Sequence, residues 1–527
     1  MLVLAPLGWY SAISLRINLL FSSSQYSLAI FYGFVLVLAY AAIFITPFLK
    51  NTWLRLTFAG VGILGFGADL AIRTLTGQTA SIDLMQTLWA ERAQASGAIE
   101  AYAPACLWIL PVLMGLAAAS ALKPPEERGL KFRYALVPIL AFSLALELMY
   151  VTREDVVSEL PSSIAVPALL AMAVSSGVRY RGARQDVDYA GDIKPQFRKI
   201  VFIVDESVRG DYLGLNSDRF DNTPVLKTAS GKIANFGIAT SSTNCSRGAR
   251  YILRSGLRES QMPDASELGL HQPSMWQYAK KAGFETIHID GFAAFAGMHS
   301  FMNAAEAKAI DKTVLPNQKP YVNIDDVAAA RLMEVMAVPQ SQFIYVEKNG
   351  VHSPYENNVP ANFVFEPAGL NKLPKPLTAD QRGKVAIYLR AIKWRVDRFF
   401  EAILPSLIRE DVLVIYTSDH GQAMFEGGYE ASHCTQINPN IGEALVPLIA
   451  FTGNSEISAK LQAEAVRAHD RASHFEIFPT LLTAMGYDPA WTASKFGPGL
   501  LSVPVERKRR FSSTQPLKPR AIWIPVD

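Results

Sequence analysis

The sequence predicts an α-helical membrane domain with five spans, followed by an α/β domain whose central sheet lies between two helix layers. Hydrophobic residues make up 50% of the 527 residues and charged residues only 18%, which is too apolar for a wholly soluble protein. Long apolar runs are concentrated before residue 152, and from Lys199 onwards short apolar runs alternate with segments of helical periodicity. The length also exceeds that of one ordinary domain.

The five predicted spans are apolar runs that each approach the roughly 20 residues a helix needs to cross a bilayer. They cover residues 2–21, 28–49, 53–75, 102–121 and 132–151. Because Arg16 lies in the first run and Asp69 and Arg73 in the third, we expect those helices to face protein or the interface there. The predicted division is a transmembrane domain at 1–155, then an interfacial helix and linker at 156–198, and then a globular domain at 199–527.

Lysine and arginine in the short loops predict the orientation of the spans. The loop LKPPEERGLKFR is the most basic and is expected in the cytoplasm, and Lys50 after the second span agrees with this. The acidic segment TREDVVSE falls on the opposite side, so everything beyond Val151 is predicted to lie outside. A short, proline-interrupted run at 164–173 favours an interfacial helix, whereas a sixth span would move the large domain into the cytoplasm.

Charge and cysteine content disfavour two classes of protein. The formal net charge of +3 is too small to indicate a nucleic-acid-binding protein. The three cysteines, Cys106, Cys245 and Cys434, lack the spacing of zinc fingers. Cys106 falls in the fourth predicted span, which leaves two thiols for the exported domain.

The globular part reads as strands alternating with helices. Apolar, β-branched runs predict buried strands at 199–204, 284–290, 342–347 and 411–418. Helical periodicity predicts helices on both faces of their sheet at 273–283, 327–337 and 384–404. The tail from Glu506, with its basic run ERKRR, is predicted to be a solvated end.

Residues of metal-ligand type follow the strands expected at 199–204 and 411–418, and also the run KIANFGIA at 232–239, which is expected to form another strand. They are Asp205-Glu206-Ser207, the hydroxyl cluster at 240–243, and Asp419-His420-Gly421. Because ligands in such sheets bind beyond the carboxyl ends of the strands, we expect these groups to meet on one rim. Oxygen and nitrogen ligands without thiolate suit a divalent ion such as Zn²⁺ or Mn²⁺.

The hydroxyl cluster leads into a helix that is expected to begin near Ser246. A hydroxyl bound to a metal ion loses its proton more easily than a free one. The positive end of the helix favours an anionic substrate at the same point. Together these features predict transfer of a phosphoryl or sulfuryl group through a covalent intermediate.

The motif TNCSR, which starts at Thr243, resembles the sulfatase-type signature of a nucleophile, any residue, proline, serine and arginine, with Cys245 in place of the proline. By this motif the globular part resembles the sulfatase and alkaline phosphatase superfamily. The whole chain resembles the lipid A phosphoethanolamine transferases of Gram-negative inner membranes. The resemblance implies that Thr243 attacks the substrate, because the family's transferases use threonine there and a threonine cannot become the formylglycine of sulfatases.

Two further blocks resemble the family's metal-binding blocks. VDESVRGDYLGLN implies that Glu206 is a metal ligand, and TSDHG implies the same for Asp419 and His420, with Thr243 completing the set. The implied ion is Zn²⁺, with Mn²⁺ as the alternative. Asp205 is a departure, because these transferases usually have glycine at that position.

Three more segments resemble family elements around the substrate. KNGVHSPY implies that His352 meets the transferred phosphate, GGYEASHC gives His433 a similar role, and SHFEIFPTLLTAMG implies a structural His474. SIDLMQTLWAERA resembles an outer loop that helps to hold the donor headgroup, with aspartate replacing the family's asparagine. The residues concerned are Asp83, Gln86, Thr87 and Glu91.

The resemblance implies a monomeric, multi-pass enzyme of the bacterial inner membrane with its catalytic domain in the periplasm. It would transfer phosphoethanolamine from phosphatidylethanolamine to lipid A or another envelope glycan or lipid. The alternatives are a phosphoglycerol transferase acting on an envelope glycan and a sulfatase-type hydrolase. The family's multiple disulfides are missing, and Cys245 and Cys434, each close to a predicted site residue, either form one bridge or remain free.

Overall fold

The computed structural model divides into two compact units, residues 1–179 and 180–527. It describes residues 26–527, except the following ranges: 77–79, 81, 91–102, 105, 153–156, 158–159, 180–182, 292–299, 317–320, 374–376, 437 and 519. The first predicted span, at 2–21, therefore lies outside the described residues.

The first unit is helical. Its described helices are α2 (Tyr26–Ile45), α3 (Thr52–Thr76), α4 (Ile82–Ala90), α6 (Ile109–Ala121), α7 (Leu136–Thr152) and α8 (Ser162–Arg179). Within the described residues, the segments Tyr26–Phe48 and Thr52–Leu75 are long and apolar enough to cross a membrane. They coincide with the second and third predicted spans.

The prediction of five spans is wrong for the described part of the chain. The fourth apolar run forms a helix of 13 residues, α6, and the fifth forms α7, which has 17 residues. The reason is that an apolar run is not always one helix. The run at 132–151, for example, begins with a separate helical turn at Phe132–Ala135, and α7 starts only afterwards.

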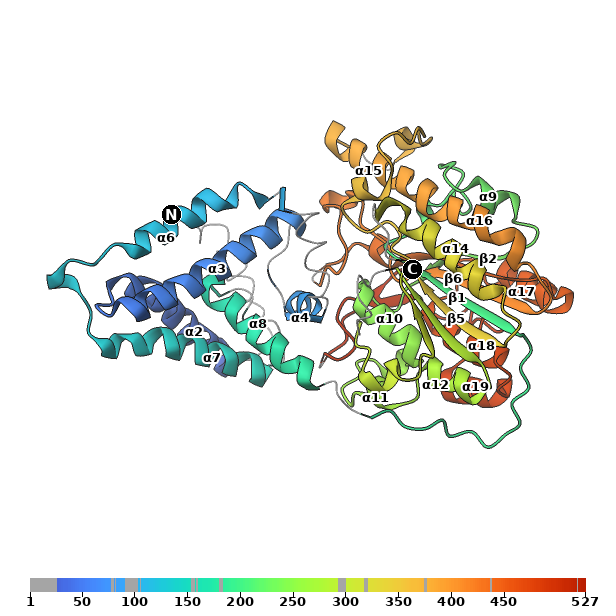
Figure 1. Ribbon diagram of the computed structural model, residues 1–527, viewed down its shortest axis with the longest axis horizontal. Coiled ribbons are helices and arrows are strands. Elements are labelled where there is room, and N and C mark those ends of the chain that lie inside the picture. The colour runs from blue at the N-terminus through green and yellow to red at the C-terminus, as the bar shows by residue number, and fades with distance from the viewer. Residues whose placement is uncertain are drawn as a thin grey trace. The chain divides into compact units, whose positions relative to one another are not determined.

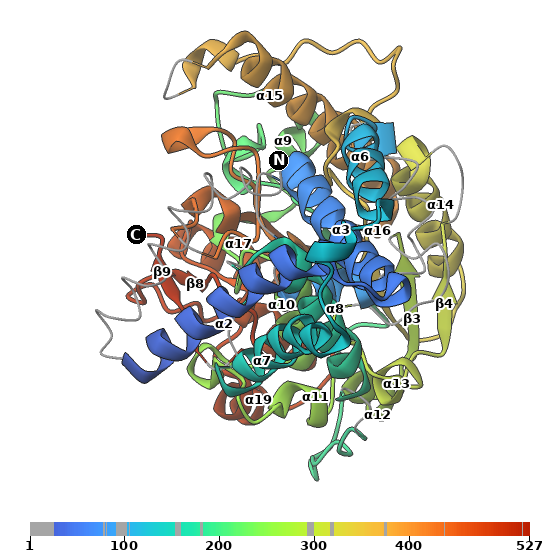
Figure 2. The same cartoon turned by 90° about the vertical axis from the view of Figure 1, so that its left-hand side faces the viewer.

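Close packing of small residues joins the helices of the first unit. Helix α3 packs against α8, and α2 packs against α7 (Figures 1 and 2). A Cβ atom on Gly65 of α3 would lie 2.8 Å from the Ser162 carbonyl oxygen and 2.9 Å from Cδ of Pro167 on α8, so only glycine permits this approach. Helix α8, which the sequence predicted as part of the segment between the domains, thus lies in the first unit.

The polar and apolar residues of the first unit are sorted as expected for membrane helices. Asp69 is buried, pairs with Arg73 at 2.9 Å and accepts a hydrogen bond from the main chain of Ala80. Ile30 and Phe34 on α2, by contrast, are exposed apolar side chains. In a membrane-anchored helical unit, charged groups typically face other parts of the protein, and exposed side chains are apolar.

The second unit contains a mixed seven-stranded sheet in the order β2-β7-β6-β1-β5-β3-β4. The strands are β1 (Lys199–Asp205), β2 (Ala234–Thr240), β3 (Glu285–Asp290), β4 (Lys312–Val314), β5 (Gln342–Glu347), β6 (Val412–Ser418) and β7 (Leu445–Thr452). Strand β7 pairs antiparallel with both β6 and β2, and the other pairings in this sheet are parallel. The strands expected from the sequence are confirmed, and the carboxyl ends of β1, β2, β5 and β6 share one edge.

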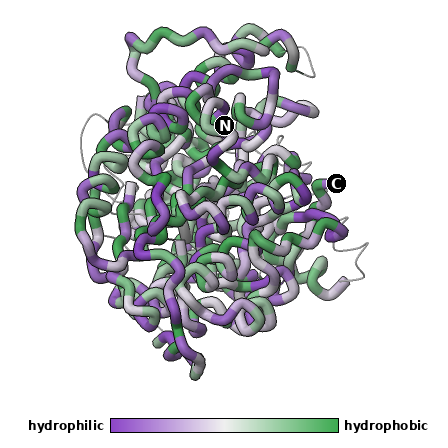
Figure 3. The backbone as a smooth tube through the Cα atoms, turned by 90° about the vertical axis from the view of Figure 1, so that its right-hand side faces the viewer, coloured by the Kyte–Doolittle hydropathy of each residue, from purple (hydrophilic) through white to green (hydrophobic). Residues whose placement is uncertain are grey.

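Helices cover both faces of this sheet, as predicted (Figure 1). Val201 and Ile203 of β1 join one core with α14 and α16, whereas Phe202 joins a second core with α12 and α18. In Figure 3, hydrophilic and hydrophobic residues alternate over short distances along the second unit, as elements with one buried face require. The helices are α9 (Pro224–Thr228), α10 (Ser246–Ser255), α11 (Leu268–His271), α12 (Met275–Lys281), α13 (Ala304–Ala307), α14 (Ile324–Met336), α15 (Ala379–Ile392), α16 (Arg398–Leu407), α17 (Ser455–Arg467), α18 (Ile477–Ala484) and α19 (Pro489–Phe496).

The C-terminal tail is folded, so its prediction as a solvated end is wrong. Strand β8 (Arg510–Ser512) pairs with β9 (Trp523–Pro525) in a separate two-stranded sheet. Arg507, in the ERKRR run, forms an ion pair of 2.6 Å with the buried Glu476. Arg509 pairs with Asp527 at 2.8 Å. Arg507 and Arg509 therefore have carboxylate partners 31 and 18 positions away in the sequence, which composition does not reveal.

Candidate metal centre and nucleophile loop

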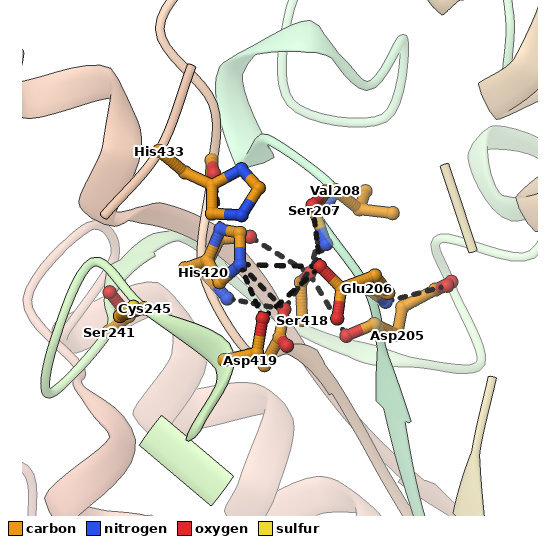
Figure 4. Close-up of polar contacts among 12 residues, drawn as sticks. Asp205, Glu206, Ser207, Val208, Ser241, Cys245, Ser418, Asp419, His420 and His433 are labelled. Atoms are coloured by element: carbon orange, nitrogen blue, oxygen red, sulfur yellow. Dashed lines mark hydrogen bonds and ion pairs between the residues drawn. The ribbon is translucent and has the colours of Figure 1, made fainter. Parts of the chain in front are cut away.

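A carboxylate and two imidazoles meet beyond the ends of β1 and β6 (Figure 4). Glu206 follows β1, His420 follows β6, and His433 comes from the loop between β6 and β7. One potential ligand atom from each lies within 4.8 Å of the other two. Glu206 Oε1 is 3.3 Å from His420 Nε2, and the two imidazole rings stack with their centroids 4.3 Å apart.

The orientation of both rings suits a metal site. Nδ1 of His420 lies 2.6 Å from the carbonyl oxygen of Gly421, and Nδ1 of His433 lies 3.0 Å from Oε1 of Gln422. Because these oxygens accept, each Nδ1 donates its proton. The lone pair of either ring, in its neutral form, then lies on Nε2. Such partners fix the tautomer of metal-binding histidines, and one carboxylate with two imidazoles fits zinc.

Arg250 of α10 sets the charge at this centre. Its guanidinium is buried, 2.6 Å from Glu206 Oε2 and 3.1 Å from Asp419 Oδ2. Burial alone would raise the pKa of Glu206, but Arg250 and His420 hold it well below the usual range, so this carboxylate is ionised. Burial lowers the pKa of His433 well below its ordinary value, which leaves the ring neutral, as a ligand must be.

Asp419, predicted as a ligand, lies at the edge of this group. Its Oδ1 accepts hydrogen bonds from the main-chain N–H groups of Ser207 and His420, at 3.1 and 2.8 Å. The same oxygen is 3.7 Å from His420 Nε2. The structure thus places His433, which was predicted to bind substrate, with Glu206 and His420, and pairs Asp419 with Arg250.

Asp205, which stands where glycine was expected, is committed to another partner. Its Oδ2 lies 2.5 Å from Nζ of Lys348 and accepts a hydrogen bond from the Tyr416 hydroxyl at 3.0 Å. All three residues are buried. A lysine ammonium therefore neutralises this carboxylate, although the neighbouring Glu206 belongs to the candidate metal centre.

Thr243 lies in the loop between β2 and α10 and is only 1% exposed. Its hydroxyl donates to the carbonyl of Cys245 at 3.0 Å. The hydroxyl of Ser246, in the first turn of α10, lies 3.0 Å from His420 Nε2 and 3.4 Å from Glu206 Oε1. Ser246 therefore connects the loop of residues 241–245, which contains the predicted nucleophile and is called the nucleophile loop below, to the candidate metal centre. It was named in the sequence motif but given no role, although its place at the helix start was a usable signal.

A disulfide joins Cys245 and Cys434, which settles the alternative left open by the sequence. The main-chain N–H of Cys434 also donates to the carbonyl of Asn244 at 2.8 Å. The bridge fixes the Thr243 loop beside the loop that carries His433. It thereby brings together residues that are nearly 200 positions apart in the sequence.

Thiol counting is expected to find one reactive cysteine in unfolded, unreduced protein and all three after reduction. The reason is that Cys245 and Cys434 are bridged, whereas Cys106 is free. Titration with a thiol reagent in denaturant, with and without prior reduction, measures this directly. Three reactive thiols before reduction would contradict the bridge.

The remaining predicted substrate residues fall in two places. The ring of His352 lies 6.3 Å from that of His433, so the structure brings the two histidines together. Asp83, Gln86 and Thr87 lie in α4 of the first unit, and Glu91 lies outside the described residues. The headgroup-binding role of that segment stays a prediction.

His474 connects two strand ends, in line with its predicted structural role. Its Nδ1 accepts from the main-chain N–H of Ser242 at 3.3 Å, and its Nε2 donates to the carbonyl of Ser418 at 2.9 Å. Burial lowers the pKa of His474 to about 3, so the ring is neutral. It holds the end of β6 close to the nucleophile loop.

Acid should destabilise the second unit through His474. Near the ordinary pKa of 6.5 the unfolded chain binds a proton that the folded chain rejects, so stability falls as the pH drops from about 6.5 toward 3. Thermal unfolding of the full-length protein at pH 7.5 and pH 5 measures this loss. His474→Gln should lower stability at pH 7.5 by about 1–3 kcal/mol and reduce the difference between the two pH values. If His474→Gln loses as much stability between pH 7.5 and pH 5 as the wild-type protein does, other groups cause the loss.

Gly248 in the first turn of α10 leaves room for the Thr243 hydroxyl. A Cβ atom there would lie 2.9 Å from Thr243 Oγ1 and 2.8 Å from Oε1 of Gln515. We expect Gly248→Ala to displace the threonine hydroxyl and lower turnover about 100-fold, at a stability cost of about 1–3 kcal/mol. Gly383→Ala in α15, where a Cβ meets nothing within 4 Å, is the matched control and should keep full activity. Equal activity of the two variants would show that a Cβ at position 248 does not displace the Thr243 hydroxyl.

Comparisons with known proteins agree with this geometry. The sequence profile of the Sulfatase family matches residues 198–487. Among curated protein sequences, none matches the chain significantly. Solved structures that share its fold at low identity include the following two.

The integral membrane protein lipooligosaccharide phosphoethanolamine transferase A (EptA) from Neisseria meningitidis is 16% identical, with a TM-score of 0.57. The similarity covers 85% of this chain and 95% of that one. The C-terminal periplasmic domain of EcEptC from Escherichia coli, solved in complex with Zn, is 17% identical, with a TM-score of 0.52. Here 65% of this chain and 96% of that one are covered. On the family match, which spans more than half of its length, the chain belongs to the sulfatase family.

Proposed function

We propose that the protein transfers phosphoethanolamine from phosphatidylethanolamine to lipid A or another glycan or lipid of the bacterial envelope. The observation that carries this proposal is the hydroxyl loop at the start of α10, in which Thr243 is buried and Ser246 contacts Glu206 and His420. A hydroxyl nucleophile in a sulfatase-family domain, joined to membrane helices, suits group transfer from a lipid donor. The fold shared with a membrane phosphoethanolamine transferase supports this choice.

The chain's own residues would carry two displacements. Thr243 Oγ1 forms a bond to the donor phosphorus while the phosphorus–oxygen bond to diacylglycerol breaks, and the hydroxyl proton leaves with the diacylglycerol oxygen. An acceptor hydroxyl then displaces Thr243, which regains a proton. The N-terminus of α10 faces the loop and favours the anionic phosphoryl group. The disulfide holds the nucleophile beside His433 through both steps.

Glu206, His420 and His433 would hold one zinc ion, with Asp419 next to them. Zinc, when bound, supplies positive charge that favours an ionised hydroxyl and a phosphoryl group in transfer. His352, close to His433, would contact the phosphoryl oxygens. Mn²⁺ is the alternative ion for the same donor atoms.

The setting that we propose is the inner membrane, with the second unit in the periplasm and the protein acting as a monomer. The apolar helices of the first unit fit membrane anchoring, and the Cys245–Cys434 bridge fits an oxidising compartment. Asp83, Thr87 and Glu91 would face the donor headgroup, where carboxylates suit an ammonium group. The partners are therefore two lipids or a lipid and a glycan, and no nucleic acid.

Mass spectrometry of envelope lipids tests this function. Cells that make the wild-type protein should gain a phosphoethanolamine group on lipid A or another envelope molecule, and cells that make Thr243→Ala should not. With purified full-length protein, diacylglycerol should form from phosphatidylethanolamine. A gain of phosphoglycerol, or release of sulfate from a sulfate ester, would replace the proposed donor by one of the two alternatives.

A further inference from the structure

The C-terminal segment 510–516 lies directly against the nucleophile loop. The main-chain N–H of Ser512 donates to the carbonyl of Ser242 at 3.0 Å, and Ser512 forms a bridge of β type with Thr243. The hydroxyl of Ser513 donates to the carbonyl of Gln436, two residues beyond Cys434. The family match ends at residue 487, so the segment 510–516 lies outside the matched region.

This segment is fixed at both ends. Before it, Arg507 binds the buried Glu476 and also donates to Ser473 at 3.0 Å. At its last residue, the carbonyl of Pro516 accepts from the main-chain N–H of Asp264 at 2.7 Å. Anchors on both sides hold the side chains between them in a set position relative to Thr243.

The side-chain oxygen of Gln515, Oε1, is buried and accepts no hydrogen bond from the described residues. The residue is only 5% exposed, and its Oε1 has no hydrogen-bond partner among the described residues. This oxygen lies 2.8 Å from the point where a Cβ on Gly248 would stand, and Thr243 Oγ1 lies 2.9 Å from the same point. A buried oxygen without a donor is costly, so its position next to the nucleophile indicates a donor that arrives with the substrate.

We propose that Gln515 positions the transferred headgroup by accepting a hydrogen bond from an N–H or O–H group on it. The inference rests on the proposed function, in which Thr243 receives the phosphoryl group and its attached headgroup lies a few ångströms away. A carbonyl oxygen is repelled by phosphoryl oxygens but attracted by an ammonium or hydroxyl group. Phosphoethanolamine carries such a donor at its far end, and phosphocholine, which has no N–H, does not.

The test compares donor lipids with and without an N–H group on the full-length enzyme. Wild-type protein should load Thr243 from phosphatidylethanolamine at least about tenfold more efficiently, in kcat/KM, than from phosphatidylcholine. Gln515→Met, which keeps the length but removes the acceptor, should reduce that preference at least about fivefold. Gln515→Glu keeps an acceptor oxygen and should retain the preference.

Two controls separate positioning from a structural role. Arg510→Gln alters the exposed pair with Glu259 in the same segment, and should change neither the preference nor zinc content. Gln515→Met should keep its zinc and its unfolding midpoint while the preference falls. An unchanged preference in Gln515→Met, or equal loss in Arg510→Gln, overturns the inference.

Failure of the proposed function gives a different result. If Thr243 of the wild-type protein is modified from phosphatidylglycerol and not from phosphatidylethanolamine, the proposed donor is wrong. The Gln515 contact is then tested with phosphatidylmethanol, which lacks the headgroup hydroxyls. Loss of the preference for phosphatidylglycerol over phosphatidylmethanol in Gln515→Met would still support the contact, and its persistence would overturn it.

Discussion

Glu206→Gln is expected to lose bound zinc and to lower turnover at least about 1,000-fold. The substitution keeps the shape of the side chain but removes the charge that lies 3.3 Å from His420 and 2.6 Å from Arg250. An amide is a poor zinc ligand, and it leaves the buried guanidinium with less opposite charge. Elemental analysis of the purified full-length protein, alongside a turnover assay, measures both effects. Full zinc content with normal turnover would remove Glu206 from the centre.

Asp205→Asn is the matched control for this substitution. It changes a buried carboxylate one residue earlier on the same strand end, but this one pairs with Lys348 and Tyr416. The variant should therefore keep its zinc, while losing about 3–5 kcal/mol of stability, because the buried ammonium loses its partner. Loss of zinc from Asp205→Asn as well would mean that Asp205 supports the centre, for which the hydrogen bond that its Oδ1 accepts from the main-chain N–H of Glu206 at 3.1 Å offers a route.

Thr243→Ala is expected to abolish turnover and yet keep most of the bound zinc. Its hydroxyl bonds to the main chain of Cys245, so Glu206, His420 and His433 stay in place when it is removed. Thr243→Ser retains an oxygen at the same position, although with more χ1 freedom, and should keep part of the activity. Normal turnover of Thr243→Ala would end the assignment of this residue as the nucleophile.

Ser241→Ala is the matched control for the loss of a hydroxyl in this loop. Ser241 donates to the carbonyl of Thr243 at 2.7 Å, so its removal should cost about 1 kcal/mol of stability and little turnover. A loss as large as that of Thr243→Ala would show that the loop's conformation, rather than the threonine hydroxyl, limits the reaction.

The strand ends of the second unit could be predicted because the sequence carries a local signal for them. A strand that is buried on both faces reads as a continuous apolar run, and β1, β5 and β6 do so. The parallel order then brings Glu206 and His420 to one edge. The start of α10 could also be predicted from the motif around Thr243, because a helix start has local sequence preferences.

Contacts between distant segments could not be predicted in this way. His433 joins the candidate metal centre through a loop that a disulfide and ring stacking hold in place. The sequence marks His433 and Cys434 as residues near the site, but it fixes neither the cysteine pairing nor the ring contact, because both depend on distant segments. Gln515 lies in a short segment beside Gly248, which is more than 200 residues earlier in the chain. The five spans failed for another reason: hydropathy measures how apolar a run is, and not whether it forms one unbroken helix.

The central claim is that Thr243 carries the transferred group, and peptide mapping of the loaded enzyme tests it most directly. Wild-type protein is incubated with phosphatidylethanolamine but without acceptor, digested, and analysed by mass spectrometry. The account predicts one phosphoethanolamine group on Thr243 and none in Thr243→Ala. The hydroxyl of Ser246 lies 3.4 Å from Glu206 Oε1 and 3.0 Å from His420 Nε2, which makes Ser246 the main competitor of Thr243. A phosphoethanolamine group on Ser241, Ser242 or Ser246, or an unmodified loop in an active enzyme, would contradict the account.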